Sequence, residues 1–253
     1  MTTKFFSDFQ IINYRFGDNE DSVLFDNLTQ YVDVVDQILG NTTFYNKYTI
    51  KSGDRPDTLS HLLYGTTDYY WTFYLMNEKI RRDGWPIFSN RISTIANEKY
   101  PHRTLTTTAD IGDRFYPGQE FFGLTSGTVG KILKRNLDLG QIVYDSGGNN
   151  LNSGETIQLT AASLTGTDIT NPNIAVRSDS TQVDSVHHYE DADGVTQDID
   201  PHTYVIPSGY KAVSFRDRLE EANDDLRQIN VLKPDVIGRV ASEFSAFMRN
   251  EQG

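Results

Sequence analysis

The chain has 253 residues, with 35 acidic and 23 basic side chains and a formal net charge of -12 at pH 7. Phosphate contacts need clustered Lys and Arg, so this charge argues against nucleic acid as the main partner. The absence of cysteine excludes disulfides and Cys-ligated zinc. No apolar run approaches the ~20 residues that span a bilayer, and the first residues lack the apolar core of a signal peptide. We therefore expect a protein that neither enters a membrane nor leaves the compartment of its synthesis.

Aromatic residues make up 12% of the chain, and the mean hydropathy is -0.50. Tyr and Phe are enriched at the cores of protein interfaces, so this profile suits a protein that keeps much surface for partners. A modest core with ordinary polar loops would give the same composition, and both interpretations remain open. A chain of this length can form one or two domains.

The first 46 residues begin with a short aromatic segment, which is followed by an acidic loop at 17–21. A mixed apolar segment runs from Val23 to Leu39, and its apolar residues from Leu28 onward recur at the i, i+3, i+4, i+7 spacing, which predicts a helix that ends at Gly40. The aromatic residues of the first segment are Phe5, Phe6, Phe9 and Tyr14.

The stretch 47–65 predicts a strand, a turn and a helix. Residues 48–50 are aromatic or β-branched and predict the strand, and Gly53 allows the following turn a positive φ. Pro56 presets a helical φ, so the helix should begin there and end at Gly65.

A second, aromatic-rich helix should follow within 68–77, with Asp68 as its N-cap and Trp71 on its inner face. Residues 85–87 should be extended, because the residue before a proline avoids the helical region. Apolar spacing then predicts a third helix at about 90–100.

From residue 104 to about 185 the composition shifts to Gly, Thr, Ser, Asn and Asp, and helical spacing disappears. Short alternating apolar runs are separated by turn residues at intervals of roughly ten residues, which is typical of a small all-β unit. We expect this segment to be an insertion. The runs lie at 119–122, 128–133, 141–144 and 156–159.

The last part of the chain predicts a hairpin and two helices. Asp193-Gly194 is a strong type I′ turn signal between two short apolar runs. Apolar residues spaced 4-3-4-3 then predict one helix, and Pro234 lies near the start of another. The first helical stripe comprises Phe215, Leu219, Ala222, Leu226 and Ile229.

The sequence contains neither an HExxH nor a GxSxG motif. The acidic stretch 189–200 can be aligned with an EF-hand loop, but Tyr189 would be its first ligand and Asp200 its last, where a bidentate Glu is needed. A hairpin is the better interpretation. Neighbouring strand residues such as His187 and His188 should point to opposite faces and could not easily share a metal ion. We therefore predict no catalytic residue, no metal site and no cofactor.

The turn at 50–54, the Tyr64-Gly65 helix end and the later Asn77 resemble the LysM module, a small βααβ fold that generally binds N-acetylglucosamine polymers such as peptidoglycan. The turn is lengthened by Arg55 and Pro56, and the second helix is far more aromatic than is typical. Both differences lie near the edge where a glycan would dock, so we do not expect glycan binding.

The Gly-x-Arg-Pro turn at 53–56 precedes a helix that ends in Tyr-Gly and a Tyr-Trp helix that ends in Asn. This succession resembles the LysM-like segment of the baseplate wedge protein of contractile-tailed phages of the T-even type. The aromatic N-terminus and the stretch 223–233 resemble two further segments of that family. The resemblance covers about 1–100 and 186–250, but not the middle.

We therefore expect an α+β protein: a LysM-like βααβ module with an N-terminal aromatic and helical segment, an inserted small all-β unit and C-terminal helices. The expected divisions are an N-terminal arm at 1–46, the LysM-like module and the following helix at 47–103, the β insertion at 104–185, and a hairpin with the C-terminal helices at 186–253.

The resemblance implies a non-enzymatic structural subunit of a phage tail baseplate wedge, located in the virion and assembled in the host cytoplasm. It would join neighbouring wedge proteins, or further copies of the chain, and would bind neither nucleic acid nor membrane. The alternative is a peptidoglycan-binding module of a cell-wall-targeting protein. The residues expected at the partner interface are Phe5, Phe6, Phe9, Tyr14, Arg55, Pro56, Tyr70, Trp71, Trp85, Leu219, Leu226, Arg227 and Ile229.

Overall fold

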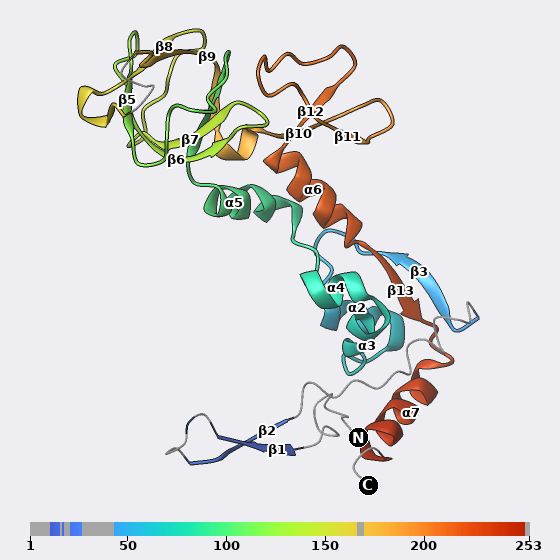
Figure 1. Ribbon diagram of the computed structural model, residues 1–253. Coiled ribbons are helices and arrows are strands. Elements are labelled where there is room, and N and C mark those ends of the chain that lie inside the picture. The colour runs from blue at the N-terminus through green and yellow to red at the C-terminus, as the bar shows by residue number, and fades with distance from the viewer. Residues whose placement is uncertain (1–10, 16, 18–20, 27–42, 166–169, 251–253) are drawn as a thin grey trace. The chain divides into compact units, whose positions relative to one another are not determined.

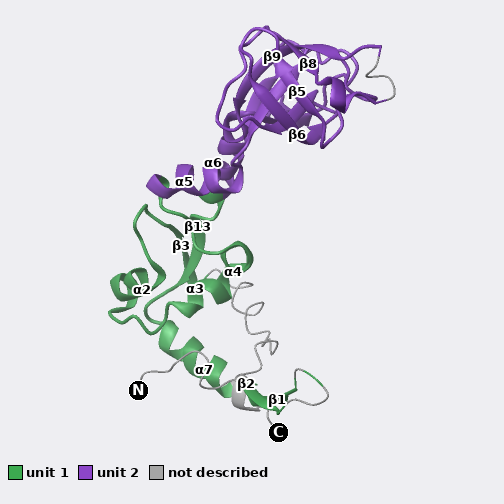
Figure 2. Ribbon diagram, turned by 90° about the vertical axis from the view of Figure 1, so that its left-hand side faces the viewer, with its two compact units in different colours: residues 1–89, 223–253 green, residues 90–222 purple. Residues whose placement is uncertain are grey.

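The computed structural model describes residues 11–15, 17, 21–26, 43–165 and 170–250, with side chains described up to residue 246. The chain divides into two compact units (Figure 2). Unit 1 comprises residues 1–89 and 223–253, and unit 2 comprises residues 90–222. Unit 2 is therefore inserted into the sequence of unit 1. Over the described ranges, no helix has the length and apolar character needed to cross a membrane.

Unit 1 is built on a two-stranded antiparallel sheet of β3 and β13, whose strands come from opposite ends of the chain (Figure 1). The register places Tyr48 opposite Ile229 and Tyr45 opposite Leu232. Short helices follow β3, and a longer helix follows β13. The elements are β3 (Tyr45–Thr49), α2 (Pro56–Tyr64), α3 (Trp71–Met76), α4 (Glu78–Asp83), β13 (Gln228–Leu232) and α7 (Ile237–Asn250).

Local chemistry sets the bounds of α2 as predicted. Gly53 has a φ of 104°, and Pro56 is the first helical residue. The Thr58 hydroxyl accepts a hydrogen bond of 3.0 Å from the backbone N–H of Arg55, which is part of a capping box. Gly65 ends the helix with a φ of 74°, and its N–H donates to the carbonyl of His61. Such a left-handed residue commonly ends a helix, because it satisfies a last-turn carbonyl.

The core of unit 1 consists of two apolar clusters, and both join the short helices to β13. Asn77, at the end of α3, bonds the backbone of β13 twice: its Nδ2 donates to the carbonyl of Asn230, and its Oδ1 accepts from the N–H of Asn230. The first cluster includes Ile50, Leu59, Phe73, Ile80, Ile229 and Val231, and the second includes Trp71, Met76, Leu232, Ile237, Val240 and Phe244.

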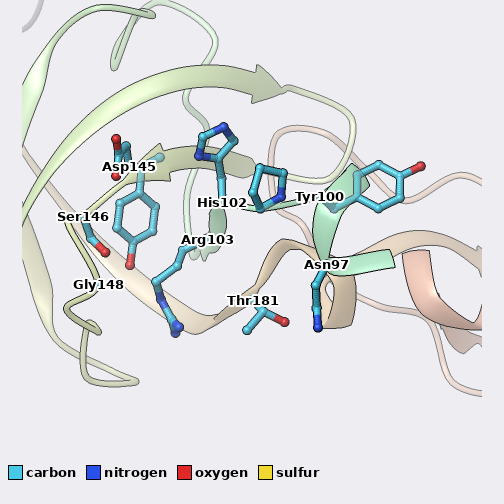
Figure 3. A pocket seen from close by; sticks show the side chains of 10 residues that line it. Asn97, Tyr100, His102, Arg103, Asp145, Ser146, Gly148 and Thr181 are labelled. Atoms are coloured by element: carbon cyan, nitrogen blue, oxygen red, sulfur yellow. The ribbon is translucent and has the colours of Figure 1, made fainter. Parts of the chain in front are cut away.

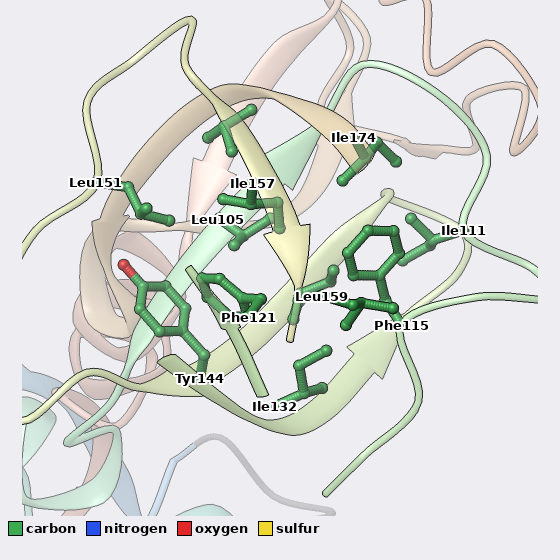
Figure 4. Packing of buried hydrophobic residues seen from close by; sticks show 12 residues of the cluster. Leu105, Ile111, Phe115, Phe121, Ile132, Tyr144, Leu151, Ile157, Leu159 and Ile174 are labelled. Carbon is green, nitrogen blue, oxygen red and sulfur yellow. The ribbon is translucent and has the colours of Figure 1, made fainter. Parts of the chain in front are cut away.

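Unit 2 is dominated by a closed antiparallel barrel with the strand order β4-β7-β6-β5-β8-β9. All six strands contribute buried apolar residues to one core cluster (Figure 4). Within this cluster the rings of Phe121 and Tyr144 pack edge to face, with their centroids 5.2 Å apart. The strands are β4 (Arg103–Thr107), β5 (Glu120–Gly123), β6 (Val129–Asn136), β7 (Gln141–Asp145), β8 (Thr156–Leu159) and β9 (Asn173–Thr181). Four of them, β5 to β8, confirm the alternating runs seen in the sequence.

A three-stranded sheet with the order β11-β10-β12 completes unit 2, and two helices connect the units along the chain. Gly194 has a positive φ at the β10–β11 turn and Asp193 does not, so the predicted hairpin is confirmed but its type I′ turn is wrong. The elements are α5 (Ser89–Lys99), β10 (Val186–Glu190), β11 (Thr196–Gln197), β12 (Lys211–Ser214) and α6 (Phe215–Asp225).

The N-terminal arm contains a hairpin of β1 (Ile11–Tyr14) and β2 (Val23–Asp26). The apolar segment that begins at Val23 therefore starts as a strand, since residues 23–26 pair with β1. The helix predicted from the spacing of Leu28 to Leu39 lies outside the described residues.

The expected architecture, an α+β protein with a LysM-like βααβ module and a small inserted all-β unit, is wrong. In a βααβ module the second strand would follow the second helix, but here α4 follows α3 and the partner of β3 is the distant β13. The β unit is a closed six-stranded barrel instead of a small insertion.

Two helical predictions also fail in part. The stripe predicted to run to Ile229 is interrupted, because α6 ends at Asp225 and Ile229 lies in β13. Asp68 does not cap the second helix, which begins at Trp71 after Tyr70. The final helix is confirmed, with Ile237, Val240 and Phe244 on its buried side.

Candidate partner interface

Two of the expected interface residues are core residues of unit 1. The Trp71 side chain is 6% exposed, and its ring packs against that of Phe244 with centroids 4.9 Å apart. Ile229 is 3% exposed on β13 and lies in the cluster with Phe73. In the folded unit 1, both side chains therefore contribute to the core.

Trp85 and Arg227 hold segments of unit 1 together. The Trp85 indole N–H donates to the carbonyl of Asp54 at 2.8 Å, and its ring lies 6.0 Å from that of Phe73. The Arg227 guanidinium donates to the carbonyls of Ile50 and Ile87, at 3.3 and 3.4 Å. These contacts join the turn after β3, the segment after α4 and the residues that precede β13, so both side chains have a structural use in unit 1.

The leucines of the predicted stripe are half-buried. Leu226 packs against the cluster that contains Ile50, so it supports the core of unit 1. Leu219 lies in the part of α6 that belongs to unit 2. The two residues therefore do not form one continuous docking stripe.

The remaining expected residues are more accessible. Arg55 and Tyr70 are exposed, and Pro56 is half-buried at the start of α2. Arg55 pairs with Asp57 at 3.2 Å, an exposed ion pair that contributes little stability. Tyr14 is exposed on β1. Phe5, Phe6 and Phe9 lie outside the described residues.

Asn223 is a residue that the sequence did not single out. It is 4% exposed, and its amide bonds both backbone groups of Ile87: Oδ1 accepts from the N–H at 2.6 Å, and Nδ2 donates to the carbonyl at 3.2 Å. Ile87 and Asn223 stand on either side of the inserted unit 2 in the sequence. The chain leaves unit 1 just after Ile87 and re-enters it at Asn223. The two hydrogen bonds therefore hold these two points of unit 1 together.

The β1–β2 hairpin is a second feature that the sequence did not predict. Its pairs are Ile11 with Asp26, Ile12 with Phe25, Asn13 with Leu24, and Tyr14 with Val23. Residues paired across two strands lie on the same face. One face is therefore wholly apolar, and the opposite face mixes apolar and polar side chains. We call the apolar one the hairpin face; it comprises Ile12, Tyr14, Val23 and Phe25.

His187 and His188 lie together, which corrects the expectation that they point to opposite faces. The β10–β12 register shifts between Val186 and His188, and the two Nδ1 atoms are 2.8 Å apart. The Nε2 of His188 lies 2.9 Å from Glu190. Burial, together with the neighbouring His188 and Arg218, lowers the pKa of His187. Among the described residues, no group of three or more His, Cys, Asp or Glu side chains has an arrangement that could hold a metal ion.

A polar pocket of about 400 Å³ opens beside the barrel of unit 2 (Figure 3). Arg103 is its main cation, but its guanidinium is held 2.6 Å from Asp179, whose side chain is 1% exposed. The Tyr144 hydroxyl donates to the same carboxylate at 2.9 Å. The positive charge is thus compensated within the barrel wall, and the pocket offers hydrogen-bonding groups without a free charge on Arg103. We assign no ligand to it.

Residues 4–103 match the family of base plate wedge protein 53, a phage family. The match confirms the resemblance to a phage baseplate wedge protein, and it supports a structural role in the tail baseplate in association with other baseplate subunits. The matched segment contains the β1–β2 hairpin, β3 and the helices α2 to α5, and it ends at the first residue of β4. No curated protein matches the chain by sequence.

Proposed function

We propose that the chain is a non-enzymatic structural subunit that joins neighbouring proteins of a phage baseplate wedge through unit 1. The match of residues 4–103 to the wedge family is the observation that carries this proposal. The chain would be assembled into the tail in the host cytoplasm, without nucleic acid or membrane as a partner. The acidic balance of -12 supports the first of these exclusions.

The division of the chain into two units supports unit 1 as the part that joins neighbouring wedge proteins. The matched segment contains β1, β2, β3 and the helices α2 to α5, whereas only the first residue of the barrel falls within it. A role common to the family is therefore expected in unit 1. The barrel would be an addition particular to this chain and its closer relatives.

The proposal is tested with the phage that encodes the chain. Purified tails are separated from heads and analysed by quantitative mass spectrometry, and the gene is deleted in parallel. We expect the chain in the tail fraction, in a fixed ratio to the other baseplate proteins, and no complete baseplates after deletion. Recovery in heads alone, or normal baseplates without the gene, would refute the proposal.

A further inference from the structure

The strand β3 leaves one edge of its sheet open. Its register with β13 places Lys47 opposite Asn230, and the backbone N–H and C=O of Asn230 point away from β3 to bond Asn77. In an antiparallel pair, two residues opposite each other either both bond across the pair or both point away from it, and the two kinds alternate. The backbone N–H and C=O of Lys47 therefore point away from β13, and so do those of Tyr45 and Thr49.

The bonds at both ends of β3 agree with this alternation. The N–H of Ile50 donates to the carbonyl of Arg227 at 2.9 Å, and the carbonyl of Phe44 accepts from the N–H of Lys233 at 3.0 Å. Even-numbered residues of the segment therefore bond toward β13, and odd-numbered ones face the open edge. Within the described part of the chain, no group bonds the outward-facing backbone atoms of β3. In Figure 1, β13 lies between β3 and α3, so the open edge is the side of β3 away from the short helices.

The other edge of the sheet is already closed. Beside Asn77, the hydroxyl of Tyr64 bonds β13 by donating to the carbonyl of Leu232 at 2.9 Å. The turn after β3 is closed as well, since the N–H of Lys51 donates to the Asp54 carboxylate at 2.9 Å. A free strand edge is a template for a further strand, and extended segments of partner proteins bind to such edges through main-chain hydrogen bonds. The open edge of β3 can therefore accept a third strand.

The charge of this edge favours an acidic partner. Residues 43–51 contain Lys47 and Lys51 and no acidic residue, whereas the whole chain has a net charge of -12. Both lysines are exposed, and neither pairs with a carboxylate among the described residues. A second copy that paired through its own β3 would bring these lysines together, and like charges directly opposite each other are destabilising. A different chain with Asp or Glu on its strand would place opposite charges there instead.

We propose that the open edge of β3, Tyr45–Thr49, binds an acidic extended segment of a different baseplate protein as a third strand of the sheet. The backbone of that segment would bond the outward-facing N–H and C=O groups, and an Asp or Glu on it would lie opposite Lys47. This inference rests on the proposed function, since it names the surface through which that function would be carried out. β3 lies within residues 4–103, which match the wedge family.

Lys47 allows the backbone and the charge to be tested separately. Its N–H points away from β13, so Lys47→Pro removes a donor that the fold of unit 1 does not use, and proline occurs on edge strands in this orientation. Lys47→Ala keeps the N–H and removes only the side chain, and Lys47→Glu reverses the charge. Lys134→Glu makes the same charge change at an exposed position of the barrel, away from the edge.

The first measurement is the amount of each variant in purified tails. Lys47→Pro loses a main-chain bond to the added strand and Lys47→Glu sets like charges opposite each other, so each should lower the amount by about tenfold or more. Lys47→Ala should lower it less than Lys47→Pro does. Lys134→Glu should lower it by less than about threefold, because an exposed charge away from the interface changes little. Purified Lys47→Glu should melt as the wild type does, since the side chain is exposed.

Hydrogen exchange reports the backbone pairing directly. In the free wild-type chain, the amides of residues 45, 47 and 49 should exchange rapidly, and those of residues 46 and 48 slowly, because the latter bond β13. In assembled tails, all five amides should exchange slowly. A photo-crosslinking residue at position 49 should also join the chain, in tails, to a different baseplate protein at a peptide containing Asp or Glu.

The outcomes separate this inference from the proposed function. If the wild-type chain is absent from tails, the proposed function fails and this inference fails with it. If the chain is present but Lys47→Pro and Lys47→Glu enter tails as well as Lys134→Glu does, the edge of β3 is not a docking surface. Rapid exchange at residues 45, 47 and 49 in tails, or crosslinking to a second copy, would also overturn the inference. If Lys47→Pro proves unstable, Lys47→Glu and the exchange of the wild-type amides still decide the question.

Discussion

Replacement of Asn223 by Ala should destabilise unit 1 specifically. The substitution removes the acceptor of the Ile87 N–H and one donor to the Ile87 carbonyl, at a site that is 4% exposed. The carbonyl keeps a bond from Arg227 at 3.4 Å, so the N–H is the group left without its acceptor. A buried backbone donor without a partner costs about 1–3 kcal/mol, and with the second bond lost we expect about 2–3 kcal/mol in total.

Tryptophan fluorescence isolates the unit in question. The chain has two tryptophans, Trp71 and Trp85, and both belong to unit 1. Urea unfolding followed by their emission should therefore report the Asn223→Ala effect without a signal from the barrel. Thermal melting by the same signal should fall by roughly 6–12 °C for this loss of stability.

A nearby substitution provides the control for Asn223→Ala. Asp224 is the next residue, and its ion pair with Arg227 is 3.0 Å long while its own side chain is 72% exposed. Exposed ion pairs contribute about 0–1 kcal/mol, so Asp224→Ala should shift the midpoint far less. If the two variants unfold at the same urea concentration, the Asn223 amide does not hold the ends of unit 1 together, and the reasoning is refuted.

Two further predictions concern unit 2. Gly140 and Gly147 both have a φ of 61°, but a Cβ at Gly140 would lie 2.5 Å from the ring of the buried Tyr204, whereas one at Gly147 would meet nothing within 4 Å. Calorimetry should show Gly140→Ala to be less stable than Gly147→Ala by about 1–3 kcal/mol, and equal losses would contradict the clash. Glu155 is buried, which raises its pKa, but backbone N–H groups including those of Ser126 and Asn152 outweigh burial and lower it below 4.5. A lowered pKa gives stability that is present above pH 4.5 and lost as the pH falls below it, so Glu155→Gln should flatten the acid limb of a pH–melting profile. An unchanged slope would argue against this role.

The elements predicted correctly from the sequence are those with local signals. Pro56 and Gly65 mark the ends of α2 because each residue fixes or permits a particular backbone conformation wherever it stands. The alternating runs of the barrel also predict strands locally. Closure of the barrel, however, depends on the pairing of β4 with β9. These strands are far apart in the sequence, and no local pattern in either one indicates the other as its partner.

The predicted interface residues include core residues, because aromatic side chains serve cores and interfaces alike. Trp71 and Ile229 looked suitable for docking, yet contacts with distant segments bury both. Ile229 also continued a helical spacing from α6, and only its pairing with Tyr48 makes it a strand residue. The hairpin face was not predicted because Val23, Leu24 and Phe25 form a continuous apolar run, in which no polar residue marks the alternation of a strand.

The pairing of β3 with β13 also sets an order of events during synthesis. Thr49 and Gln228 bond across a separation of 179 residues, and the whole of unit 2 is translated between them. At about 5–20 residues per second, β3 waits roughly 10–35 s on the ribosome for its partner strand. Unit 2 has its complete sequence before unit 1 does, so the barrel can fold first while the apolar clusters of the N-terminal half remain open. Chaperone binding to the nascent chain would be concentrated in that interval.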